Sequence, residues 1–111
     1  MKTKELINIC GLEILTELFE SDREVSGGYT SDLLSDVIAN SKKDNVWITM
    51  QTHLNIIAVA SLKELTAIIV VMNRDIETEV LEKAKEERVT VLRTNLTAYQ
   101  ISGIIYETGV K

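Results

Sequence analysis

The sequence predicts an α/β protein, in which helices cover both faces of a mostly parallel sheet of four to five strands in an α/β/α layered fold. Segments with helical spacing of apolar residues alternate along the chain with short segments rich in β-branched residues. One of these, "AIIVVM" at residues 67–72, is apolar throughout, as expected of a central strand buried on both faces. Because 111 residues support one core of useful size, residues 1–111 are predicted to form a single domain.

The first quarter of the chain predicts one helix and two extended segments. Residues 3–10 have the apolar spacing of a short amphipathic helix, and Gly11 stands where a glycine ends such a helix. Residues 12–19, "LEILTELF", are typical of a strand, and residues 25–29 of a second, shorter one that leads into a turn at the glycine pair.

The middle of the chain predicts a helix, a strand and a second helix. Ser31 or Asp32 is expected to cap a helix that ends near Asn40, and residues 46–50, "VWITM", predict a strand. Thr52 is expected to cap the next helix, which is apolar around nearly its whole circumference as far as Leu65.

The last third of the chain continues the alternation. After the strand at residues 67–72 and a turn at residues 73–75, a helix is predicted to about residue 87. Residues 89–93 predict a strand, and Thr94 or Asn95 is expected to cap a final helix that ends before Gly109.

Polar residues stand near the predicted ends of several strands and define a candidate site. The carboxyl ends of parallel strands meet at one edge of a sheet, where open α/β folds bind ligands. Helix amides behind Thr52 favour an anion there, and the alternative is that these side chains only satisfy turns and caps. Tyr29 either stacks on a ligand or holds the turn in place. The candidate ligand-binding residues are Gly27, Gly28, Tyr29, Gln51, Thr52, His53, Asn55 and Thr94.

Several chemistries are excluded because the residues that they require are absent. No glycine is followed by the lysine of a P-loop, and the adjacent glycines do not match a dinucleotide fingerprint. One histidine and one cysteine form neither a multi-histidine nor a cysteine-based metal site. We therefore expect no cofactor, no metal and no catalytic residue. A small phosphotransfer enzyme that uses His53 with Ser26 or Asp32 is the enzymatic alternative.

The charge of the chain bears on its partners. A net charge of −5, from 12 basic and 17 acidic residues, provides no basic face for nucleic acid or an anionic membrane, so neither is expected as a partner. Polar residues interrupt every stretch of signal-peptide or membrane-spanning length, which predicts a cytoplasmic protein. Cys10 has no partner for an internal disulfide and is expected to be a small core residue.

Three segments that cover most of the chain resemble a stand-alone DRTGG domain. Laid on residues 24–28, the name-giving motif agrees at both glycines and has Ser26 in place of threonine. Similar domains form the N-terminal domain of HPr kinase/phosphorylase and lie between the CBS domains of certain pyrophosphatases. The three segments are "REVSGGYTSDLLSDVIAN", "VWITMQTHLNIIAVASLKELTAIIV" and "ETEVLEKAKEERVTVLRTNLTAYQISG".

This resemblance implies an accessory module that takes part in regulation and in contacts between subunits. The sequence accordingly predicts a non-enzymatic regulatory and dimerisation module that senses a small anionic or nucleotide-like ligand and signals to a protein partner. The alternative is an interaction scaffold without a ligand. A homodimer is expected through the apolar helix at residues 54–65 or through the helix after Gly28, since a small monomer has little material to cover both of their faces.

Overall fold

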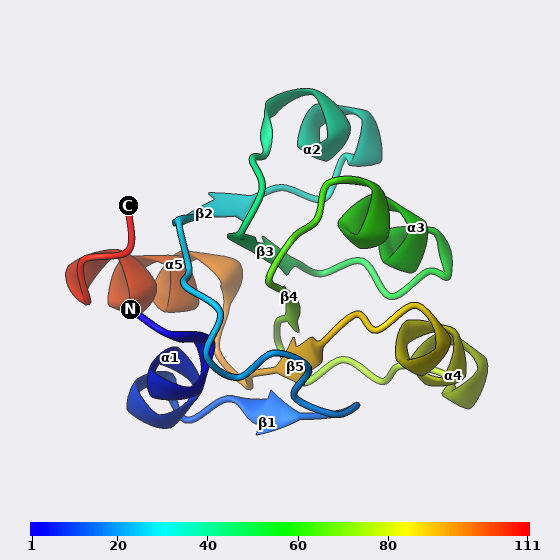
Figure 1. Cartoon of the computed structure of the whole chain (residues 1–111), viewed down its shortest axis with the longest axis horizontal. Helices are drawn as coiled ribbons and strands as arrows, with labels where there is room; N and C mark the ends of the chain where they lie inside the picture. Colours follow the sequence, from blue (N-terminus) through cyan, green and yellow to red (C-terminus); the bar gives the residue numbers. More distant parts are fainter.

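The computed structural model describes all residues from Met1 to Lys111 and contains five helices and five strands (Figure 1). Their order along the chain, αββαβαβαβα, is the one that the sequence pattern predicts. In that order the elements are α1 (Thr3–Cys10), β1 (Glu13–Ile14), β2 (Gly27–Thr30), α2 (Leu34–Asn40), β3 (Asn45–Thr49), α3 (Asn55–Leu62), β4 (Ala67–Val70), α4 (Thr78–Glu86), β5 (Val91–Arg93) and α5 (Ala98–Glu107).

The sheet has the strand order β1-β5-β4-β3-β2. β2, β3, β4 and β5 are parallel, and only β1 is antiparallel to its neighbour β5. The strand that is apolar throughout, β4, lies in the centre and all four of its residues are buried. This confirms the prediction of a mostly parallel sheet of four to five strands, and the number of strands is five.

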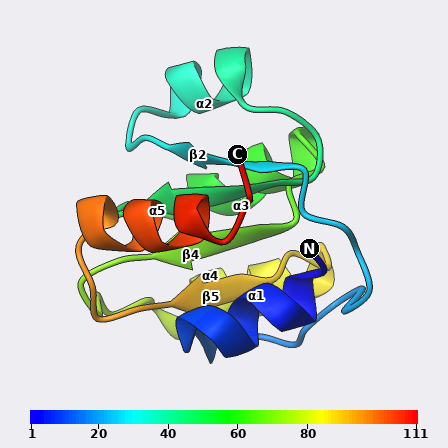
Figure 2. The ribbon, with the colours of Figure 1, turned by 90° about the vertical axis from the view of Figure 1, so that its left-hand side faces the viewer.

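Helices cover both faces of the sheet, three on one and two on the other. Successive parallel strands lie side by side, so their right-handed crossovers place α2, α3 and α4 on one face, and α1 and α5 cover the opposite face (Figures 1 and 2). Neighbouring residues of a strand face opposite layers. Trp47 packs in the core under α2, α3 and α4, whereas Ile48 packs in the core under α1 and α5.

Two of the predicted extended segments differ from the structure. The strand expected at residues 12–19 is reduced to the two residues of β1, which pair with Leu92 and Arg93 at the end of β5. The glycine pair, expected in a turn after a strand, lies inside β2. None of the five helices has the length and apolar character needed to cross a lipid bilayer.

The predicted N-caps of three helices are also wrong. The N-cap residues are Leu33 for α2, Leu54 for α3 and Thr97 for α5, in place of Ser31 or Asp32, Thr52, and Thr94 or Asn95. Thr97 forms a capping box with Gln100, the residue three positions later. Asp32 instead bonds to Thr49 and Met50, and the hydroxyls of Ser31 and Thr94 accept from the amides two residues later, those of Leu33 and Leu96.

Candidate functional site

The predicted site residues lie at two opposite edges of the sheet. Gly27 pairs with Asn45, the first residue of β3, so the glycine pair is at the amino-terminal edge of the parallel strands. Gln51, Thr52 and His53 follow the last residue of β3 and therefore lie at the carboxyl edge. Asn55 begins α3 and Thr94 follows β5 at the same carboxyl edge. The expected convergence of all eight residues at one edge is therefore wrong.

Several polar groups of the carboxyl edge hold the strand ends together. One carboxylate oxygen of Asp32 accepts hydrogen bonds from the Thr49 hydroxyl and the Met50 amide, each 2.8 Å long. The Gln51 side chain donates to the Asp32 carbonyl at 3.1 Å. Thr94 is buried, and its hydroxyl accepts from the Leu96 amide. These contacts engage Gln51 and Thr94, whereas the side chains of Thr52, His53 and Asn55 form no hydrogen bond within the chain.

The cavity beside Thr52 and His53 has an acidic lining. Its volume is about 380 Å³, and the carboxylates of Asp75, Glu77 and Glu79 surround it. Thr52 does not cap α3, and the three carboxylates repel an anion more strongly than one helix terminus attracts it. The sequence predicts an anion at this edge from the helix amides alone. Local patterns do not show that Asp75, Glu77 and Glu79 line the same cavity.

The structure does not assemble the alternative catalytic pair. Ser26 precedes β2 at the amino edge, whereas His53 follows β3 at the carboxyl edge. His53 forms no hydrogen bond with Ser26 or with Asp32, and the Asp32 carboxylate already accepts two hydrogen bonds. No group of three or more acidic, histidine or cysteine side chains is arranged to hold a metal ion.

A basic cavity of about 460 Å³ surrounds the glycine pair at the amino edge. β2 is an edge strand that pairs only with β3, so one row of its backbone amides and carbonyls faces outward. Two lysines from the loop after α2 line the cavity beside this row, and the backbone of Lys111 lies against Gly27. The cavity is lined by Ser26, Gly27, Gly28, Tyr29, Asn40, Lys42, Lys43, Asn45 and Lys111.

The loop that carries two of these lysines is fixed by a chain of hydrogen bonds. The Lys42 amide donates to the Asn45 side-chain oxygen at 2.9 Å, and the Asn45 side-chain amide donates to the Ser26 hydroxyl oxygen at 3.1 Å. The Ser26 hydroxyl in turn donates to the Lys43 carbonyl at 2.7 Å. Both lysine side chains remain exposed at the surface. Neither lysine is among the site residues predicted from sequence, because the polar segment "NSKKDN" carries no local pattern that marks a binding site.

Gly27 and Gly28 differ in how much space the structure leaves for a side chain. A Cβ at Gly27 would lie 3.2 Å from the Asn45 side-chain nitrogen and 3.3 Å from the Lys111 carbonyl carbon, which is tighter than ordinary contact. A Cβ at Gly28 would lie 3.6 Å from a Val46 methyl group, which is ordinary contact. Close packing therefore explains Gly27, whereas the available space would accept a side chain at Gly28.

Tyr29 connects β2 to α2. Its hydroxyl donates to the Asp36 carboxylate at 2.7 Å, and the Asn40 side chain donates to the same oxygen at 2.8 Å. The hydrogen bond from Tyr29 is the main cause of a lowered Asp36 pKa, and it raises the pKa of Tyr29. The tyrosine thus holds the strand against the helix, and its ring forms one wall of the basic cavity.

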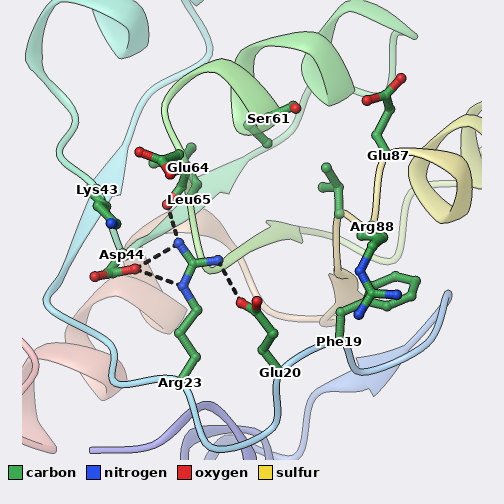
Figure 3. A pocket seen from close by; sticks show the side chains of 12 residues that line it. Phe19, Glu20, Arg23, Lys43, Asp44, Ser61, Glu64, Leu65, Glu87 and Arg88 are labelled. Carbon is green, nitrogen blue, oxygen red and sulfur yellow. Dashed lines mark hydrogen bonds and ion pairs between the residues drawn. The ribbon is translucent and has the colours of Figure 1, made fainter.

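A second cavity at the amino edge, of about 520 Å³, is organised by Arg23 (Figure 3). The guanidinium donates to the Asp44 carboxylate at 2.7 Å, to Glu20 at 3.4 Å and to the Glu64 carbonyl. Arg88 lies over the Phe19 ring in the same cavity. Because its carboxylates offset its cations, this cavity is less suited to an anion than the one at Gly27 and Gly28.

Comparisons with known proteins show the fold. No protein-family model and no curated protein sequence matches the chain. Its structure is similar to the crystal structure of the CBS and DRTGG domains of the regulatory region of Clostridium perfringens pyrophosphatase, complexed with the activator diadenosine tetraphosphate. The TM-score is 0.71 at 14% sequence identity over 94% of this chain and 45% of that chain. The chain thus has a DRTGG-like α/β fold and spans less than half of that regulatory region.

Proposed function

We propose that this chain is a regulatory module that binds a small anionic, nucleotide-like ligand in the basic cavity around Gly27 and Gly28. The observation that carries the proposal is the convergence of Lys42 and Lys43 on the open edge of β2. Their two ammonium groups and the outward backbone amides are donors of the kind that a phosphate group needs. The fold similarity to a regulatory region crystallised with a nucleotide activator supports the same class of ligand.

The electrostatic balance of this edge favours an anion. α2 ends at Asn40, and the carboxyl end of a helix carries roughly half a negative charge. The two full positive charges of Lys42 and Lys43 outweigh that partial charge, and the cavity lining contains no acidic side chain. Lysines at the carboxyl end of a helix also stabilise the helix without any ligand. Their position is therefore equally compatible with the alternative function, an interaction scaffold.

Ligand-dependent melting separates the sensor from the scaffold. Thermal unfolding would be followed with inorganic phosphate, pyrophosphate, ATP and diadenosine tetraphosphate at increasing concentration. A ligand present at one hundred times its Kd stabilises by about 2.7 kcal/mol, which corresponds to about 10 °C for a chain of this size. The absence of any shift across the panel would support the scaffold and overturn the sensor.

Charge-reversal variants locate the site. Lys42→Glu combined with Lys43→Glu is expected to abolish the shift, because it replaces both loop lysines of the cavity with acids. Lys4→Glu combined with Lys85→Glu is the matched control, since it makes the same change of charge at two exposed lysines outside the cavity. If both variants lose the shift to the same extent, attraction is general to the chain and the assigned site is wrong.

A further inference from the structure

The outer side of α5 exposes large apolar side chains to an unusual degree. Tyr99 is 89% exposed, Tyr106 57% and Ile104 39%, while Ile101 and Ile105 of the same helix are buried in the core. The exposed residues follow one another at helical spacing and form a continuous surface. We call this surface the α5 face and define it by Tyr99, Gln100, Gly103, Ile104, Tyr106 and Glu107.

Gly103 lies in the middle of this face, and nothing in the chain itself explains it. Glycine destabilises a helix interior relative to alanine. A Cβ at position 103 would meet no atom within 4 Å, and the backbone there does not have a positive φ. Its missing side chain leaves a shallow groove of about 600 Å³ between the two tyrosines. Small residues in such a position allow the backbone of another helix to approach closely.

We propose that the α5 face packs against the α5 face of a second copy of this chain, with the two helices antiparallel and crossing at Gly103. A two-fold axis through Gly103 brings together residues at equal distances before and after it. Tyr99, four residues before, then faces the partner's Glu107, four residues after, so that a phenol donor meets a carboxylate acceptor twice. Gln100 likewise faces the partner's Tyr106. This self-complementarity favours a second copy over an unrelated helix.

Charge and coverage agree with this choice. The chain has a net charge of −5, so two copies repel one another over most of their surface, but Glu107 is the only charged residue of the α5 face. The Lys111 ammonium lies 4.9 Å from the centre of the Tyr106 ring and adds a positive charge beside it. Only α1 and α5 cover this side of the sheet (Figure 2), and α1 also has an exposed apolar side chain, Ile9, at 58%.

α3, one of the two helices expected from sequence to form a dimer, is largely covered by its own chain. α3 packs between α2 and α4, and its residues Ile56, Ile57, Val59 and Ala60 are buried in the core of this chain. The helix is therefore apolar around its circumference because neighbours of the same chain cover it. Its largest exposed apolar side chain is Leu62, at 68%.

Oligomeric state measured by sedimentation velocity tests the proposal on the full chain. A single helix pair with its flanking residues is a small interface, so we expect a dimer with a Kd of about 10 µM. Tyr99→Glu is expected to raise this Kd at least about tenfold by placing two acids opposite one another. Leu62→Glu, which makes the same change of charge on α3, should leave this Kd unchanged.

Gly103→Ala adds a test in which folding and pairing change in opposite directions. In the monomer the new methyl group meets open space, so the melting temperature measured well below the dimer Kd should rise by about 4 °C. In the dimer the same group keeps the helices apart, so the Kd should rise. A chain that stays monomeric at about 200 µM, or a dimer weakened by Leu62→Glu and not by Tyr99→Glu, would overturn the proposal. The anion-dependent melting shift of the Tyr99→Glu monomer tests the ligand site separately.

Discussion

Two helices end with a residue that is in the left-handed conformation but is not glycine. Replacing such a residue with glycine measures the stability that this conformation costs the fold. After α3, Glu64 has φ 53°, and after α4, Arg88 has φ 56°. In both places the following amide bonds back to the third-last helical residue, Leu65 to Ala60 and Val89 to Ala84, as in a Schellman motif. α1 ends at the equivalent position with Gly11. Glu64→Gly is therefore the perturbation of choice.

The magnitude follows from the backbone angles. A side chain in the left-handed region costs about 1–2 kcal/mol, and glycine costs about 0.4–1 kcal/mol through the greater freedom of the unfolded chain. Glu64→Gly should thus stabilise the fold by about 0.5–1 kcal/mol. The Glu64 carbonyl accepts from the Asp44 amide and from Arg23, and glycine keeps that carbonyl. The neighbouring Lys63 has φ −86°, so Lys63→Gly relieves no backbone strain and should destabilise the fold by about 1 kcal/mol.

Urea unfolding followed by tryptophan fluorescence measures both variants. Trp47 is the only tryptophan and is fully buried, so its emission reports on the core directly. The expected result is a higher midpoint for Glu64→Gly and a lower one for Lys63→Gly, with unchanged slopes. If both variants lose stability equally, the left-handed conformation at position 64 does not carry the assigned cost.

Three further predictions concern single contacts. Asp32→Ala should destabilise by about 2 kcal/mol in urea unfolding, because the buried Thr49 hydroxyl loses its acceptor; a loss below about 0.5 kcal/mol would contradict this role. The lowered pKa of Asp36, due first to the Tyr29 hydroxyl, contributes stability above the unfolded pKa of about 3.9 that is lost as the pH falls through the lower folded value. Tyr29→Phe should therefore flatten the decline of unfolding free energy with acid, and an identical decline would refute it. Burial raises the pKa of the Cys10 thiol, so alkylation at pH ~8 should be slower in the folded chain than in urea, with equal rates as the opposing result.

The order of the elements and the class of the fold could be predicted from local patterns. The uninterrupted apolar run of β4 indicates a strand with a helix layer on each face, and that strand is central and fully buried. Gly11, at a positive φ where α1 ends, is likewise a local signal. Such features depend on residues within a few positions of one another, and the sequence displays them directly.

The candidate site depended on contacts that the sequence does not display. Gly27 and Gly28 were expected after a strand, and only the pairing of Gly27 with Asn45 shows that they lie at the amino edge beside lysines. Ser31 and Thr52 lie close to helix starts and have the residue types of caps, but the helices begin at later residues.

What the sequence alone determined was therefore the set of elements, their order and the layered α/β class, since each follows from periodicity and from turn chemistry within a few residues. The tertiary structure decided which polar groups share a cavity. Arg23 illustrates the reason, because its partners Asp44 and Glu64 are 21 and 41 residues away along the chain. Strand register and loop paths bring such groups together, and they are set by the packing of the whole core rather than by local propensity.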